Sequence, residues 1–135
     1  MTLKELSQLY YLNREIEIDK QRLARLRAEM PEARAAKLDG MPISSGNGSG
    51  SAIERHIAEI VDLEFIISAK ITQCIHERAR LERYIAEIPD SLTRQIFTLR
   101  FINGLPWAQV AYSIGGNTED SVKKICYRYL NGDLD

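Results

Sequence analysis

Apolar residues recur at alternating spacings of four and three through the middle of the chain, from Ser51 to Ile88. The positions at this spacing form a stripe of eleven residues, nine of them apolar: Ile53, Ile57, Ile60, Glu64, Ile67, Ile71, Cys74, Arg78, Leu81, Ile85 and Ile88. This heptad-like spacing, uninterrupted by Gly or Pro, predicts one long amphipathic helix. Such a helix is not stable alone, so its apolar stripe must meet another helix.

A second periodic segment runs from Thr2 to about Glu29, with Leu and Ile at similar spacings. Thr2 and Glu5 match a capping box, and Pro31 is expected to end or restart the helix before Leu38. The two segments predict a long antiparallel, coiled-coil-like hairpin, or a swap of helices between two copies. Because the apolar stripe of the segment from Ser51 to Ile88 is wider than one partner helix covers, a homodimer through the long helices is expected.

The segment between the two periodic regions is rich in Gly and Ser. It cannot bury apolar area, which predicts a flexible linker over 39–52. Its glycines raise the possibility of a phosphate-binding loop, but the Gly-Lys-Ser/Thr ending of such loops is missing. We therefore interpret this segment as a linker.

Three shorter apolar patterns follow Pro89. Asp90 is a good N-cap for the first helix, and an Asn-Gly pair after residue 102 ends it. Pro106 opens the second helix, and a Gly-Gly-Asn turn leads to Thr118, a plausible N-cap for the third, over 119–130. Three short helices with a glycine turn before the last are typical of a helix-turn-helix.

The patterns together predict an all-α protein. Its expected parts are an N-terminal long helix over 1–38, a linker over 39–52, a long amphipathic helix over 53–88 that pairs with the first, and a three-helix helix-turn-helix domain over 89–135.

The residues after Pro89 resemble region four of bacterial sigma factors, the domain that reads the upstream promoter hexamer. The matching positions are Arg94, Ile96, Leu99, Arg100, Gly104, Leu105, Trp107, Val110, Ala111, Ile114, Gly115, Thr118, Ser121, Val122, Lys123 and Arg128. Pro106 replaces the usual Ser or Thr cap, and the turn is one residue longer than the common one, which affects the pitch of the last helix. Residues 38 to 131 are similar to prophage-encoded late-transcription regulators of the ArpU and RinA type, and to an uncharacterised family of Gram-positive phage proteins. The resemblance implies sequence-directed binding of double-stranded DNA and control of transcription.

In helix-turn-helix proteins the start of the last helix enters the major groove. With Val122 and Cys126 facing inward, the expected DNA-binding residues are Arg100, Thr118, Glu119, Asp120, Ser121, Lys123, Lys124, Tyr127 and Arg128. Lys123 and Lys124 suit guanine edges or phosphates, and the acidic pair suits either a cytosine amino group or only the helix dipole. Trp107 is expected in the core rather than as a stacking platform for bases.

The formal net charge of −1 argues against strong nonspecific DNA binding. Two alternatives therefore stay open: a sigma-like module that binds RNA polymerase, and a DNA-packaging adaptor of the small terminase type. No nucleophile–base pair, carboxylate dyad or metal cluster has workable spacing, so we expect no enzyme, no cofactor and no metal site. His56 and His76 are interpreted as surface or half-buried histidines, and Cys74 and Cys126 as small buried thiols. No segment predicts a membrane span or a secretory signal, which indicates the cytoplasm of a bacterial host cell.

Overall fold

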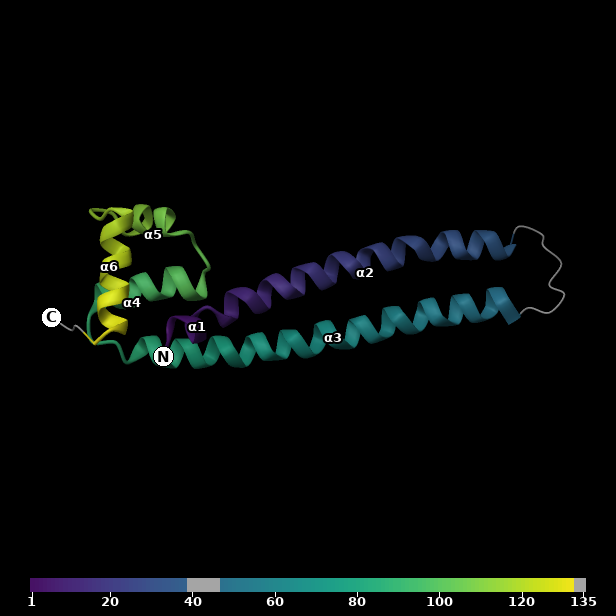
Figure 1. Ribbon diagram of the computed structural model, residues 1–135, viewed down its shortest axis with the longest axis horizontal. Helices are drawn as coiled ribbons and strands as arrows, with labels where there is room; N and C mark the ends of the chain where they lie inside the picture. Colours follow the sequence, from purple (N-terminus) through teal and green to yellow (C-terminus); the bar gives the residue numbers. More distant parts are fainter. Residues whose placement is uncertain (39–46, 133–135) are drawn as a thin grey trace. The chain divides into compact units, whose positions relative to one another are not determined.

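The computed structural model describes the backbone of residues 1–38 and 47–132 and the side chains of 1–30 and 51–132. All regular elements within these ranges are helices, which confirms the all-α prediction. In order they are α1 (Leu3–Leu6), α2 (Gln8–Leu38), α3 (Asn47–Ala86), α4 (Ser91–Phe97), the π-helix η1 (Thr98–Ile102), α5 (Trp107–Ile114) and α6 (Glu119–Leu130) (Figure 1). The chain forms two compact units, a head unit of Met1–Asn13 with Gln73–Asp135 and a long-helix unit of Arg14–Thr72. None of the helices in the described ranges has the length and apolar character needed to cross a bilayer.

The N-terminal helix is interrupted earlier than its sequence suggests, and it continues where a break was expected. The capping box is confirmed, since the Thr2 hydroxyl accepts from the Glu5 amide at 3.2 Å and a Glu5 carboxylate oxygen accepts from the Thr2 amide at 2.9 Å. The first helix ends at Ser7, whose hydroxyl donates to the Leu3 carbonyl. The expected end or restart at Pro31 is wrong, because α2 runs on to Leu38. A proline inside a helix removes one amide donor and crowds the carbonyl four residues earlier, which is why an end was expected here.

The second long helix starts within the segment that we interpreted as a linker. It begins at Asn47 rather than at residue 53. Adding turns to an existing helix costs much less than nucleating one, so a polar segment in front of Ile53 is drawn into the helix. The rest of the expected linker, over 39–46, lies outside the described residues.

Apolar and ionic contacts join α2 and α3 in the long-helix unit. We call the contacting positions of α3 the inner seam; those in this unit are Ile53, His56, Ile60, Leu63, Ile67 and Lys70. On α2, Ile16 and Leu23 are buried. Lys70 Nζ lies 2.5 Å from Asp19 Oδ2 and 3.5 Å from Glu15 Oε2, Arg27 pairs with Glu64 at 3.2 Å, and His56 Nε2 lies 2.5 Å from the Leu26 carbonyl oxygen. These partners pair rising numbers on α2 with falling numbers on α3, so the two segments run in opposite directions.

The inner seam differs at alternate positions from the stripe that the spacing predicts. Ile53, Ile60 and Ile67 belong to both, but Leu63 is buried in place of Glu64, and Ile57 and Ile71 are exposed. The seam instead includes His56 and Lys70, whose polar groups find partners on α2. The single stripe expected for α3 is therefore partly wrong, because two overlapping stripes share every second position and the partner helix decides between them.

The core of the head unit is formed by α1, the first turn of α2, the end of α3 and the four elements that follow. Its buried members are Leu6, Leu9, Leu81, Ile85, Ile88, Ile96, Phe97, Phe101, Trp107, Val110, Ala111, Val122 and Cys126. Phe97 is fully buried, and its ring centroid lies 5.3 Å from that of Phe101 and 5.5 Å from that of Tyr129. Because Tyr129 belongs to α6 and Phe97 to α4, this cluster fixes α6 against the rest of the unit. In Figure 1, α6 crosses both α4 and α5, in agreement with its contacts.

The sequence signals for the ends of the short helices are confirmed. The Asp90 carboxylate caps α4 by accepting from the Thr93 amide at 3.0 Å and from its hydroxyl at 2.7 Å. These hydrogen bonds, the hydroxyl first, lower the pKa of Asp90. Gly104 takes a φ of 70°, which favours glycine, directly after η1 ends. Pro106 is the N-cap of α5, one position before its expected place inside the helix.

Candidate nucleic-acid interface

The start of α6 is set by a glycine turn and a side-chain cap. Gly115 and Gly116 have φ values of 77° and 67°, a conformation that other residues rarely adopt. Thr118 is the N-cap, as its sequence position predicts, and its hydroxyl accepts from the Ser121 amide at 3.1 Å. The Ser121 hydroxyl donates to Asn117 Oδ1 at 3.0 Å. The turn and cap together fix where the helix begins and which side faces the core.

One side of α6 is buried in the core of the head unit. Val122 and Cys126 have no exposed surface, as the pattern predicts, and Tyr129 and Leu130 are half-buried. Burial raises the pKa of the Cys126 thiol to about 12, so this thiol is neutral and unreactive near neutral pH. Cys126 therefore serves packing, as the sequence indicates. Cys74 is only half-buried, and its thiol lies 3.6 Å from Asn13 Oδ1.

The opposite side of α6 is open. Asp120, Lys124, Tyr127 and Arg128 are all exposed, Tyr127 to 39%. Their spacing of three and four residues places them on one helical face. Among the described residues, no carboxylate forms an ion pair with Lys124 or Arg128. This face carries two cations and one carboxylate, together with an aromatic edge, and it is free to contact another molecule.

The remaining expected contacts at the start of α6 already have partners within the head unit. Lys123 Nζ pairs with Glu119 Oε1 at 3.2 Å, one turn back on the same helix. The hydroxyls of Thr118 and Ser121 are used in the cap and in the turn. These four residues flank the open face, and Lys123 reaches a further anion only by leaving Glu119.

Arg100 is held by the head unit rather than extended into solvent. Its Nη1 donates to the Leu105 carbonyl at 3.0 Å, and its guanidinium carbon lies 4.6 Å from the centroid of the Trp107 ring. Trp107 is buried, which confirms its expected place in the core, and its ring lies 6.1 Å from that of Tyr127 on α6. Arg100 therefore contacts Trp107, which in turn contacts Tyr127 on the open face. Its guanidinium fixes the loop between η1 and α5.

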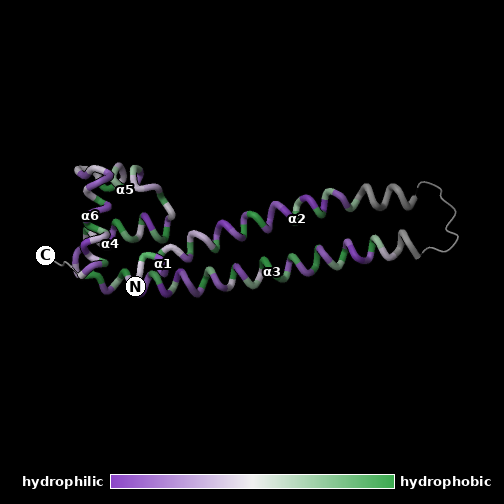
Figure 2. The backbone as a smooth tube through the Cα atoms, in the orientation of Figure 1, coloured by the Kyte–Doolittle hydropathy of each residue, from purple (hydrophilic) through white to green (hydrophobic). Residues whose placement is uncertain are grey.

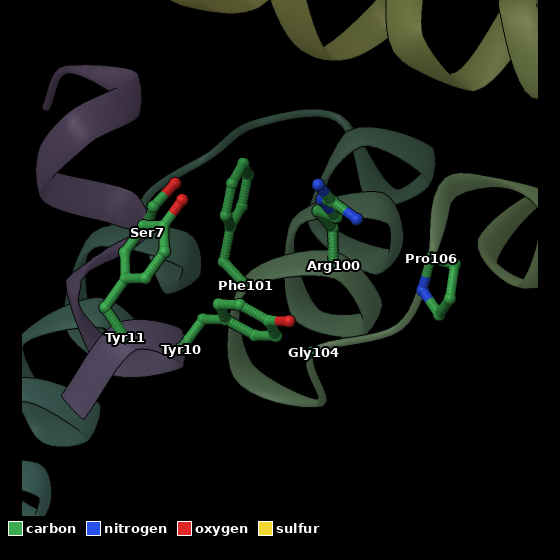
Figure 3. Close-up of a pocket in the computed structure, with 7 residues that line it drawn as sticks. All are labelled: Ser7, Tyr10, Tyr11, Arg100, Phe101, Gly104 and Pro106. Atoms are coloured by element: carbon green, nitrogen blue, oxygen red, sulfur yellow. The ribbon is translucent and has the colours of Figure 1, made fainter. Parts of the chain in front are cut away.

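A cleft of about 400 Å³ lies on the Arg100 side of the head unit. Figure 3 shows its lining residues Ser7, Tyr10, Tyr11, Arg100, Phe101, Gly104 and Pro106. The Tyr10 ring packs beside Gly104, where an added Cβ would lie 3.6 Å from Tyr10 Cδ2. No sequence pattern predicts this cleft, because it lies between the first turn of α2 and a loop some ninety positions later in the chain.

The sequence did not predict two exposed residues of the head unit, Asn131 and Tyr112. Asn131 follows Lys124 by seven residues, which places it on the same face, and its exposed amide extends the polar surface beyond the end of α6. The seven-residue spacing was visible in the sequence, but Asn131 lies just beyond the helix, which ends at Leu130 as predicted. Tyr112 on α5 is 87% exposed, which its apolar neighbours did not predict.

No group of three or more His, Cys, Asp and Glu side chains in the described part of the chain is arranged to hold a metal ion. His56 is half-buried beside the Leu26 carbonyl, and His76 is exposed. Both positions agree with the expectation of surface or half-buried histidines.

Comparison with protein-family models, with curated proteins and with solved structures finds no match for this chain.

Proposed function

We propose that the protein is a sequence-specific DNA-binding transcriptional regulator of phage or prophage origin. In this proposal α4, α5 and α6 form a helix-turn-helix of the sigma region-four type, and α6 enters the major groove. The observation that carries the proposal is the two-sided nature of α6. Val122 and Cys126 anchor one side in the core, while Lys124 and Arg128 lie exposed on the other without an ionic partner among the described residues.

The roles within the interface follow from the chemistry of each side chain. Lys124 is placed to bind a guanine edge, and Arg128 is placed to bind a phosphate. Asp120 and Glu119 can accept from a cytosine amino group, although Glu119 is also the partner of Lys123. Thr118, Ser121 and Tyr127 flank these contacts. Arg100 supports the surface through Trp107 and reaches the DNA backbone only if its hydrogen bond to Leu105 is released.

The long helices complete the proposal. α2 and α3 form an antiparallel, coiled-coil-like hairpin through which two copies associate as a homodimer. A two-fold dimer carries two copies of α6, so its DNA sites are expected to be inverted repeats. The protein works without a catalytic site or a cofactor, in the cytoplasm of the bacterial host.

Selection of bound duplexes from a random pool, followed by sequencing, tests this function. The proposal predicts enrichment of one inverted-repeat motif at low salt, and a binding constant that falls as salt rises because lysine and arginine displace counterions from phosphates. If no motif is enriched at low salt by a folded protein, the proposed function is wrong.

A second candidate is an RNA polymerase-binding module with little DNA affinity of its own. The ion pair between Glu119 and Lys123 favours it, because this pair removes one of the few cations near the open face. Co-purification with polymerase that survives replacement of Lys123 and Lys124 by Ala would support this candidate over the first. The DNA-packaging adaptor predicts a ring of subunits in solution instead of a dimer.

A further inference from the structure

A second apolar stripe runs along α3 beside the inner seam. Figure 2 shows hydrophobic residues recurring along this helix at short intervals. We call the second set the outer stripe; with spacings of four and three, it consists of Ile57, Val61, Glu64, Ser68, Ile71 and Ile75. Its apolar members are 43%, 43%, 41% and 63% exposed, in chain order, and the adjacent Phe65 is 73% exposed. Exposed apolar residues in such a row mark a binding surface.

The spacing of the outer stripe defines the shape of its occupant. Alternating steps of four and three are the signature of a seam between two helices that lie nearly parallel or antiparallel. The occupant is therefore a helix with the same spacing, and α3 of a second copy supplies one.

The order of residues in the outer stripe selects a second copy in one orientation. The stripe reads apolar, apolar, polar, polar, apolar, apolar from either end. In an antiparallel pair whose two-fold axis lies midway between Glu64 and Ser68, Ile57 meets Ile75 of the second copy, Val61 meets Ile71, and Glu64 meets Ser68. A parallel, in-register pair would instead place Glu64 against Glu64, and like charges in a seam destabilise it.

The two polar positions at the centre of the outer stripe, Glu64 and Ser68, are compatible with such a pair. Glu64 Oε2 lies 3.2 Å from Arg27 of α2, so its charge is offset within its own chain. Phe65 lies one position from Glu64 and is the most exposed of these apolar side chains. In the antiparallel pair it lies next to the axis and can cover these two polar positions.

We propose that the outer stripe of α3 binds the same stripe of a second copy, antiparallel and around a two-fold axis midway between Glu64 and Ser68. This inference rests on the homodimer included in the proposed function and names its surface. It does not depend on DNA binding.

Sedimentation equilibrium of the full chain without DNA tests the surface. The wild-type chain is expected to be a dimer at micromolar concentration. Ile71→Glu is expected to weaken the dimer by about 100-fold or more, because it would bury an unpaired carboxylate. Ile66→Glu is the matched control: Ile66 is 47% exposed on the same helix, nine residues from both Ile57 and Ile75 and so half a turn away from them.

Disulfide cross-linking in a Cys74→Ala background tests the orientation. The double variant Ile57→Cys with Ile75→Cys is expected to give a covalent dimer, whereas either single variant is not. A monomeric wild-type chain, a ring of subunits, or equal effects of Ile71→Glu and Ile66→Glu would overturn the surface. Efficient cross-linking by Ile57→Cys alone would overturn the orientation. Because no DNA is present, failure here leaves the proposed DNA binding untouched, and failure of the duplex selection leaves this result untouched.

Discussion

The ion pair of Lys70 with Asp19 is the most informative place to perturb the long-helix unit. The two side chains are only 25% and 16% exposed, and their charged atoms lie 2.5 Å apart in the inner seam. Replacing Asp19 with Ala leaves the Lys70 ammonium in a half-buried position, where an unpaired charge is costly. Glu15, 3.5 Å away and 57% exposed, remains as a weaker partner.

The expected loss in the free energy of unfolding lies between the values for a fully buried and a fully exposed ion pair. Breaking a fully buried pair costs about 3–5 kcal/mol, and breaking an exposed pair costs about 0.2–1 kcal/mol. With partial burial and a remaining carboxylate, Asp19→Ala should destabilise the unit by about 1–3 kcal/mol, whereas Glu15→Ala should cost less than about 1 kcal/mol. Replacing both Lys70 and Asp19 with Leu should recover the loss, because an apolar pair suits the seam.

Native-state hydrogen exchange of the amides in α2 and α3, at fixed protein concentration, measures these changes locally. Glu17→Ala is the control, since Glu17 is exposed on the same helix. The hydrogen bond from Lys70 to Asp19 raises the pKa of Lys70. Its stabilisation is therefore complete below the pKa of an unfolded lysine, and it is lost as the pH rises through the higher folded value. Equal effects of Asp19→Ala and Glu15→Ala would refute this reasoning.

Three further predictions concern α6. Thr118→Ala should destabilise the head unit by about 1 kcal/mol through loss of the N-cap, measured by chemical denaturation with Thr118→Ser as the control. Cys126 should resist alkylation until the head unit opens, and labelling as fast as that of a model thiol would contradict its burial. Because burial raises the pKa of Cys126 to about 12, the free energy of unfolding of the head unit should fall as the pH rises from about 9 towards that value. Glu119→Gln releases Lys123, so it should strengthen DNA binding and steepen the dependence of log K on log salt by about 0.9; weaker binding would instead indicate that Glu119 contacts a base.

The local features of the fold could be predicted because each depends on a few neighbouring residues. The caps at Thr2, Asp90 and Thr118 each require only one side chain and the next three amides. The buried side of α6 followed in the same way from the spacing of Val122 and Cys126.

The inner seam could not be read from spacing alone, for a physical reason. Hydrophobicity alone favours burial of Ile57 and Ile71 over burial of His56 and Lys70. However, α2 supplies partners for the polar groups of His56 and Lys70. That choice depends on residues some thirty to fifty positions away. The apolar pattern along one helix does not show which partners another helix supplies.

The environment of Arg100 was missed for a similar reason. Its hydrogen bond to Leu105 and its contact with Trp107 depend on the π-helical turn of η1, which the spacing of apolar residues cannot distinguish from an α-helical one. Arg100 was therefore expected among the exposed contacts, and the structure places it half-buried behind them.

The affinity of the Lys124→Ala variant for the selected duplex tests directly whether the open face of α6 reads DNA. Fluorescence anisotropy at several salt concentrations would compare it with wild type and with Lys20→Ala, an exposed lysine of the long-helix unit. We expect a loss of about 1–3 kcal/mol in binding free energy for Lys124→Ala and none for Lys20→Ala, with the loss confined to one base position of the site. Equal affinities of the two variants would contradict a DNA-reading role for the open face of α6.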